Sequence, residues 1–317
     1  MPSLTTSPLV TPKPLPAGGC LGIISPAAPS SQNALNTGVE LLQAQGYRVK
    51  LFPNAAASHH HLAGTDAQRL ADLHAAFADS DVDVILCSRG GYGCMRLLDK
   101  LDWDLLRANP KWLVGFSDVT ALQIALYQQL GWKSLYGPML TSNLVDDDPA
   151  LFDWHWSALH PLLGGEVPSL WTVPNTDDYH AIHAPTNSPN VVEAPLLGGN
   201  LSLLSALCGT PWQPRPKNHL LFIEDWNESH YTLDRKFQQL KLAGVLEGIT
   251  GLLLCDFSGI AAEPDGWPLV DFFKDWFADS PFPVGYGLSV GHGNVTATLP
   301  QGGTARWDVV SGQLTLV

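Results

Sequence analysis

The chain has 317 residues, of which 45% are hydrophobic, and its formal net charge at pH 7 is -13. This length and this apolar fraction allow a sizeable buried core and favour two domains over one. The acidic balance disfavours a nucleic-acid partner, which needs a basic surface. A membrane protein is equally disfavoured, because no apolar run approaches the roughly 20 residues that span a bilayer.

The first 18 residues are rich in Pro, Ser and Thr and lack the basic and apolar regions of a secretory leader. We expect residues 1–18 to be a flexible lead-in to a cytoplasmic protein. The five cysteines are odd in number and have no C-x-x-C spacing. They are typical of small buried residues in a reducing compartment.

Strand and helix patterns then alternate. Residues 20–26 predict a buried strand, residues 31–46 a helix, and residues 47–52 a second strand. A further helix is predicted from Thr65 to about Asp79, followed by a strand at residues 82–88. The strand-helix-strand order predicts a parallel sheet with right-handed crossovers. We therefore expect an α/β domain over residues 19–145.

The last strand of this domain is predicted at residues 112–116, where the apolar period changes from that of a strand to that of a helix at Ser117. A hydroxyl at a strand-to-helix turn lies near free N–H groups and the positive end of a helix, which suits a nucleophile. The common alternative is that Ser117 or Asp118 only caps the helix. Val119 stands where the second glycine of G-x-S-x-G would be, so this is no α/β-hydrolase elbow by pattern.

A glycine-rich loop, Arg89-Gly90-Gly91-Tyr92-Gly93, follows the strand at residues 82–88. Ligands of parallel sheets gather at the carboxyl ends of the strands, which is where this loop and Ser117 both fall. The glycines would let backbone N–H groups approach a ligand, although a structural turn explains them equally well. The loop is neither a P-loop nor G-x-G-x-x-G, so nucleotide binding is weakly supported.

Residues 146–190, with scattered prolines and several Trp and His residues, are interpreted as a connector that contains a helix around residues 154–163. A second, mixed α/β domain is predicted over residues 191–317. In it, Pro195-Leu196-Leu197-Gly198-Gly199-Asn200 leads into a helix at 201–208. Further strands and helices are predicted at residues 220–223, 232–243, 249–256, 284–288, 295–299, 304–309 and 313–316.

Three polar features each have a plain alternative. Glu224 ends an apolar strand and is explained equally well as a polar strand end before a helix cap. His292 lies between two glycines and could be a turn residue without a role. The run His59-His60-His61 suggests a metal, but consecutive histidines cannot all face one ion, and no second cluster has ligand spacing. We therefore expect no metal and no cofactor.

Together these stretches resemble the LD-carboxypeptidase family of serine peptidases, which includes the microcin C7 immunity peptidases. The resemblance runs from about Gly19 to the C-terminus. It rests on Ile24-Ser25-Pro26-Ala27, Leu62-Ala63-Gly64-Thr65-Asp66, Arg89-Gly90-Gly91-Tyr92-Gly93, Gly115-Phe116-Ser117-Asp118, Leu197-Gly198-Gly199-Asn200, Phe222-Ile223-Glu224-Asp225 and Gly291-His292-Gly293.

The resemblance implies a flavodoxin-like N-terminal domain that carries Ser117, and a C-terminal domain that carries Glu224 and His292. These three residues would form a Ser-His-Glu triad. The backbone N–H of Asp118 and that of Gly90 or Gly91 would form the oxyanion hole. The resemblance also implies a homodimer.

The family's reaction removes a terminal D-amino acid from an L,D bond, most often D-Ala from a muropeptide tetrapeptide in cell-wall recycling. Microcin-type relatives instead cleave an amide in a peptidyl nucleotide, and Trp171 or Trp226 could there stack on the base. The sequence departs from the pattern of many cell-wall members at Asp225-Trp226-Asn227-Glu228. This departure leaves the choice of substrate undecided. Two further hypotheses are a catalytically silent peptide-binding module, which the intact triad disfavours, and a metal-dependent amidohydrolase, for which the sequence offers no ligand set.

The expected substrate contacts are Arg89, Tyr92, Asn200 and Trp226. Arg89 opens the glycine loop, and its guanidinium suits the anionic end of a carboxypeptidase substrate. A structural salt bridge is the alternative for this arginine.

Overall fold

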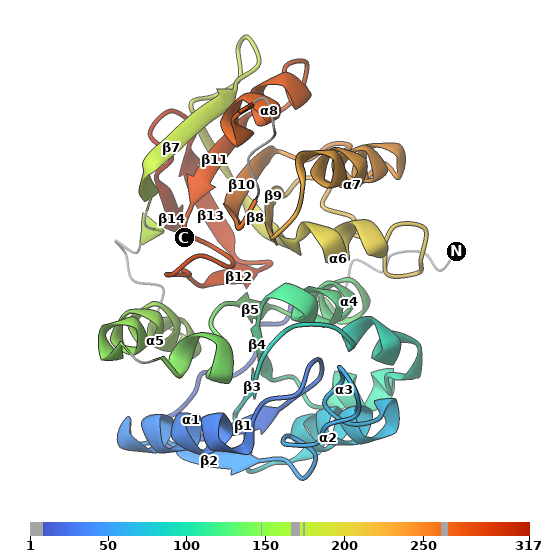
Figure 1. The fold of residues 1–317 in the computed structure, drawn as a ribbon, viewed down its shortest axis with the longest axis vertical. Coiled ribbons are helices and arrows are strands. Elements are labelled where there is room, and N and C mark those ends of the chain that lie inside the picture. Colours follow the sequence, from blue (N-terminus) through green and yellow to red (C-terminus); the bar gives the residue numbers. More distant parts are fainter. Residues whose placement is uncertain (1–8, 147, 166–171, 174, 261–265) are drawn as a thin grey trace. The chain divides into compact units, whose positions relative to one another are not determined.

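The computed structural model of the protein describes residues 9–146, 148–165, 172–173, 175–260 and 266–317. The chain forms two compact units, Met1–Glu166 and Val167–Val317, which Figure 1 draws from blue to green and from yellow-green to red. The division falls inside the predicted connector, residues 146–190. The finer boundaries of the lead-in, the connector and the two domains stay a prediction.

The first unit is built on parallel strands in the order β2-β1-β3-β4-β5. This is the flavodoxin-like order, so the expected fold of this unit is confirmed. The central strands β1, β3 and β4 are buried along their whole length, as in a sheet covered on both faces. The strands are β1 (Cys20–Ile24), β2 (Arg48–Leu51), β3 (Val84–Cys87), β4 (Trp112–Gly115) and β5 (Ser134–Tyr136).

Two helices of this unit begin at a residue whose side chain caps the helix. The Ser31 side chain accepts from the Ala34 N–H at the start of α1, and Thr65 forms a capping box with Gln68 at the start of α2. Residues 149–163 form α5, which confirms the helix expected around 154–163. The helices are α1 (Gln32–Ala44), α2 (Asp66–Ala78), η1 (Cys94–Lys100), α3 (Trp103–Ala108), η2 (Ser117–Val119), α4 (Thr120–Leu130), η3 (Leu140–Leu144) and α5 (Pro149–Leu163).

The second unit contains a mixed sheet in the order β6-β14-β13-β8-β9-β10-β11-β7. Its centre, from β8 to β11, is parallel, and the flanking pairs are antiparallel. The predicted mixed α/β class is therefore confirmed. The strands are β6 (Thr172–Val173), β7 (Asn175–His183), β8 (Val191–Asn200), β9 (Leu220–Trp226), β10 (Gly251–Ser258), β11 (Val284–Leu288), β12 (Leu299–Gln301), β13 (Thr304–Asp308) and β14 (Leu314–Leu316). The helices are α6 (Leu201–Ala206), α7 (His230–Leu242) and α8 (Leu269–Trp276).

Three of the differences from the sequence-based expectation in this unit concern the strands β7, β12 and β8. Residues 175–183 of the expected connector form β7, which pairs antiparallel with β11. The strand expected at 295–299 lies later, as β12 at 299–301. Residues 191–200 form the strand β8 although Pro195 interrupts them. This proline is tolerated because residues 191–195 pair only with β13, whereas pairing with β9 begins at Leu196.

Gly198 lets β8 and β9 approach closely. A Cβ added there would lie 1.8 Å from the Phe222 carbonyl oxygen. The Gln301 side chain also holds this position, since its Oε1 accepts from the Gly198 N–H at 3.0 Å and its Nε2 donates to the Gly198 carbonyl at 2.7 Å. A side chain at residue 198 would therefore have to push two central strands apart.

We expect Gly198→Ala to destabilise the protein by about 3 kcal/mol, because overpacking a close backbone approach forces the strands to move. Thermal melting would show this as a lower Tm. Gly164→Ala is the matched control, since its added Cβ would meet no atom closer than 3.4 Å. Equal melting temperatures for the two variants would contradict this account of β8.

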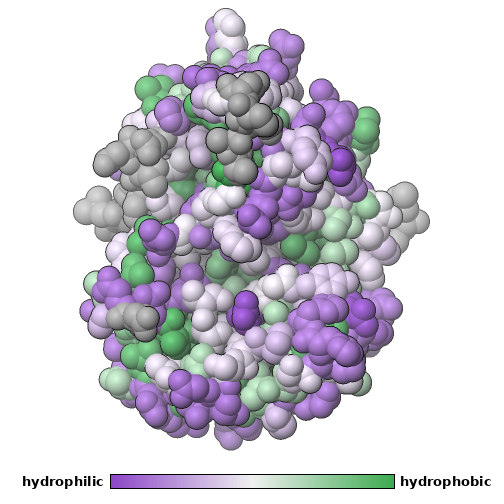
Figure 2. Space-filling model, viewed as in Figure 1, coloured by the Kyte–Doolittle hydropathy of each residue, from purple (hydrophilic) through white to green (hydrophobic). Residues whose placement is uncertain are grey.

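Most of the large apolar side chains are buried in the cores of the two units. On the face drawn in Figure 2, hydrophobic residues occupy small separate areas among hydrophilic and intermediate ones. No helix in the described part of the chain is long and apolar enough to cross a membrane.

Candidate functional site

Ser117 lies at a tight turn between β4 and η2. The preceding residue, Phe116, is extended, with φ of -146°, whereas Ser117 has φ of 60°. A positive φ is uncommon and strained for a residue with a side chain, and it occurs at nucleophile turns. The Ser117 N–H donates to the Tyr136 hydroxyl at 3.2 Å, which ties the turn to β5.

The cap alternative does not describe this turn. The N-cap residues of η2 and α4 are Phe116 and Val119, not Ser117 or Asp118. The buried Asp118 carboxylate instead accepts from the Cys94 N–H at 2.8 Å, a residue just beyond the glycine loop. Burial raises the pKa of Asp118. Its side chain thus joins the loop to the serine turn.

The glycine loop packs directly against this turn. A Cβ added at Gly90 would lie 2.9 Å from the Ser117 Cβ and 3.0 Å from its Oγ. Gly91 has φ of 110°, and a Cβ there would meet the Ala28 Cβ at 2.5 Å. Gly90 is therefore needed for the loop to approach Ser117 so closely, and Gly91 for the loop to pass beside Ala28. The structure brings Gly90, Ser117 and Asp118 together within the first unit.

Two predicted contact residues lie on the exposed side of the same loop. Arg89 is exposed, and its Nη1 donates to the Pro29 carbonyl at a long 3.4 Å. Among the described residues it forms no ion pair, so the structural salt bridge offered as its alternative is not found there. Tyr92 is 48% exposed, and its ring lies 5.6 Å from that of His61.

The second unit pairs His292 with Glu224. Glu224 lies near the end of β9 with a fully buried side chain, and its Oε2 is 2.6 Å from Nδ1 of His292, whose side chain is 20% exposed. Gly291 makes room for this contact, because a Cβ there would lie 2.7 Å from the same carboxylate oxygen. A Nδ1 proton donated to Glu224 leaves Nε2 of the imidazole as a proton acceptor.

The charges around His292 set its acid-base behaviour. Burial lowers the pKa of the imidazole, but the hydrogen bond to Glu224 and the negative charges of Glu224, Asp225 and Asp256 outweigh it, so the pKa of His292 is raised above its ordinary value. The imidazolium is thus stabilised, as a general base requires when it takes a proton. The Trp226 indole stacks on the ring at 5.9 Å and an interplanar angle of 18°, and this Trp is 54% exposed.

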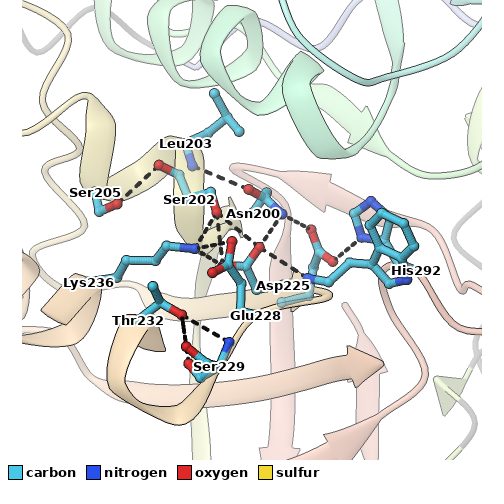
Figure 3. A network of polar contacts seen from close by, with 12 residues as sticks. Asn200, Ser202, Leu203, Ser205, Asp225, Glu228, Ser229, Thr232, Lys236 and His292 are labelled. Atoms are coloured by element: carbon cyan, nitrogen blue, oxygen red, sulfur yellow. Dashed lines mark hydrogen bonds and ion pairs between the residues drawn. The ribbon is translucent and has the colours of Figure 1, made fainter. Parts of the chain in front are cut away.

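Asn200, the last residue of β8, contacts Glu224 of the His292–Glu224 pair. Asn200 and Glu224 are register partners of β8 and β9. The Asn200 amide donates to Glu224 Oε1 at 3.1 Å and to Asp225 Oδ1 at 3.0 Å, while its Oδ1 accepts from the Leu203 N–H. Figure 3 shows the amide between the carboxylates of β9 and the start of α6. Sequence reasoning named Asn200 as a substrate contact and missed its bonds to the two acids.

The other positions named from the sequence are the histidine run at residues 59–61 and Trp171. The His59 and His60 rings lie 4.5 Å apart on an exposed loop. Within the described ranges, no group of three or more His, Cys, Asp or Glu residues could hold a metal ion. Trp171 lies outside the described residues.

Comparison with known proteins agrees with this architecture. Residues 21–137 match the model of an LD-carboxypeptidase N-terminal domain, and residues 193–307 match that of an LD-carboxypeptidase C-terminal domain. A probable murein peptide carboxypeptidase of Bacillus subtilis is 34% identical over 93% of this chain and 90% of its own.

Two solved structures are similar over nearly the whole chain. A muramoyltetrapeptide carboxypeptidase from Oxalobacter formigenes has a TM-score of 0.80 at 29% identity, with 94% of this chain and 97% of that chain covered. The structure of MccF in complex with glutamyl sulfamoyl guanosine has a TM-score of 0.86 at 25% identity, with coverage of 96% and 98%. From these matches over both units, the chain belongs to the LD-carboxypeptidase family.

Proposed function

We propose that the protein is a cytoplasmic serine LD-carboxypeptidase that releases the terminal D-Ala of muropeptide tetrapeptides in cell-wall recycling. The observation that carries the proposal is the His292–Glu224 pair, in which a fully buried carboxylate holds Nδ1 of a partly exposed imidazole at 2.6 Å. Such a pair prepares Nε2 to accept the proton of a nucleophile. The similarity to murein carboxypeptidases supports this choice of substrate.

In the proposed reaction, Ser117 Oγ attacks the carbonyl carbon of the L,D amide while His292 Nε2 takes the hydroxyl proton. Collapse of the tetrahedral intermediate breaks the C–N bond, and His292 gives the proton to the leaving amine of D-Ala. A water molecule, activated by the same imidazole, then hydrolyses the ester on Ser117. Glu224 holds the imidazole and stabilises its charged form.

The oxyanion would be bound by the backbone N–H of Asp118 and by that of Gly90 or Gly91. The close packing of Gly90 on Ser117 supports this assignment, as does the position of Asp118 in the first turn after the serine. Loss of one such donor typically costs about 2.7 to 4 kcal/mol in transition-state stabilisation.

A second candidate is cleavage of the amide in an aminoacyl or peptidyl nucleotide. The observation that favours it is Trp226, which is exposed and lies against the His292 ring, where an aromatic could stack on a base. The MccF structure similar to this chain was determined with glutamyl sulfamoyl guanosine.

One experiment separates the candidates. The purified protein is incubated in parallel with an L,D-tetrapeptide and with an aminoacyl sulfamoyl nucleotide, and the product masses are read. Tripeptide and D-Ala support the muropeptide function, whereas free amino acid from the second substrate supports the nucleotide function. No product from either would favour the silent peptide-binding module.

Arg89 is proposed to contact the substrate carboxylate, since it is an exposed residue of the glycine loop that packs on Ser117 and has no ion pair among the described residues. We expect Arg89→Ala to lower kcat/KM for a free-acid tetrapeptide by on the order of 100-fold, and to affect the C-terminal amide far less. The exposed Arg107→Ala, which loses only a local pair with Asp104, is the control. Equal losses on both substrates would favour a structural role for Arg89.

A further inference from the structure

A chain of polar contacts runs from Glu224 away from His292 and into the second unit. Glu224 and Asp225 are consecutive residues of β9, and the single amide of Asn200 donates to both carboxylates. Asp225 is buried and accepts from the Ser202 hydroxyl as well, at 3.1 and 3.0 Å. Two neighbouring buried acids therefore share one neutral donor, an arrangement that needs a compensating positive charge.

Lys236 supplies that charge from α7. Its Nζ lies 2.9 Å from Asp225 Oδ2, 2.7 Å from Glu228 Oε1 and 2.6 Å from the Ser202 hydroxyl. Figure 3 shows the lysine side chain extended toward Asp225 and Ser202. Only 15% of the side chain is exposed, against 3% for Asp225. This ion pair is thus largely removed from water, unlike a surface salt bridge.

The packing of α7 fixes the position of the Lys236 backbone. Leu233, Phe237 and Leu240 are all fully buried on the inner side of α7. Phe237 packs among the rings of Phe257, Phe273 and Phe277. Because these anchors surround residue 236 in the sequence, the backbone of Lys236 is held in place, and its side chain reaches Asp225 from a fixed starting point.

We propose that Lys236 is a positioning residue for the reaction proposed above, on which this inference rests. By neutralising Asp225 and holding its carboxylate beside Asn200, it keeps the Asn200 amide directed at Glu224, and it balances the negative charge near His292. It touches neither His292 nor Glu224, and it acts through Asp225 and Asn200.

The charged groups around His292 determine the direction in which its pKa changes when Lys236 is removed. Glu224 and Asp225 of β9 and Asp256 of β10 all favour the charged imidazole. Glu228 faces the lysine but is partly exposed. Burial raises the pKa of Asp225 and the Lys236 ammonium lowers it. Where Asp225 stays ionised, loss of the ammonium leaves its charge uncompensated, so the imidazolium is held more tightly. The pKa of His292 should rise further, and the neutral base should form only at higher pH.

The test uses Lys236→Met in the full chain and follows the His292 ring by NMR as pH is raised, with His292→Gln to assign the signal. We expect the titration midpoint of His292 to move to higher pH than in the wild-type protein. The double variant Asp225→Asn/Lys236→Met removes both charges, so its midpoint should return toward the wild-type position. Lys241→Met, an exposed lysine of the same helix, should leave it unchanged.

Activity gives a second measurement. On an L,D-tetrapeptide, Lys236→Met should lower kcat/KM on the order of threefold to tenfold on the acid side of the pH profile, with recovery at high pH, and Lys236→Arg should restore much of the loss. A His292 midpoint that is unchanged or lowered in folded Lys236→Met would overturn the inference. If that variant does not fold, Lys236→Gln is titrated and judged in the same way. The NMR titration does not depend on activity and can be read even if the wild-type protein cleaves no tetrapeptide. A failure of the inference about Lys236 is therefore distinguishable from a failure of the proposed function.

Discussion

Ser117→Ala is expected to lower kcat for an L,D-tetrapeptide by on the order of 10⁶-fold, and Ser117→Ala/His292→Ala should be hardly slower. The reason is that the proposed base acts only through the proposed nucleophile, so removing either one disables the same step. Initial rates of D-Ala release by the single and double variants measure this. Thermal melts serve as the control for folding. Multiplicative losses in the pair would mean that Ser117 and His292 serve separate steps.

Glu224→Gln should be milder, with a loss on the order of 10⁴-fold, because nucleophile and base remain while the carboxylate that orients the imidazole is gone. The substitution also removes the negative charge of Glu224, which contributes to raising the pKa of His292. The acid limb of kcat/KM should therefore move to lower pH in the residual activity, opposite to its shift in Lys236→Met. A pH–rate profile from pH 5 to 9 measures both effects. An unmoved acid limb would contradict the coupling of Glu224 to the base.

The position of the serine could be predicted from the sequence, but its conformation could not. The change of apolar period at Ser117 is a local signal, and the strand and helix on its two sides followed from it. Ser117 has a positive φ, and its N–H donates to Tyr136 on a strand 19 residues further on. Local pattern carries no information about that partner.

The same limit explains what was missed in the second unit. Pro195 and the two following glycines are typical of a loop, yet β8 forms because β13 pairs with its first half and β9 with its second half. Asn200 meets Glu224 because the two are register partners on neighbouring strands. Nothing in the spacing indicates which strands are neighbours. Lys236 lies 34 residues after Ser202, although both side chains donate to the Asp225 carboxylate.

Ser117 is proposed as the nucleophile of an LD-carboxypeptidase. The most direct test is to incubate the wild-type protein and folded Ser117→Ala in parallel with an L,D-tetrapeptide and to read the product masses. We expect tripeptide and D-Ala from the wild-type protein and neither above background from the variant. Tripeptide formation by Ser117→Ala at the wild-type rate would contradict this proposal.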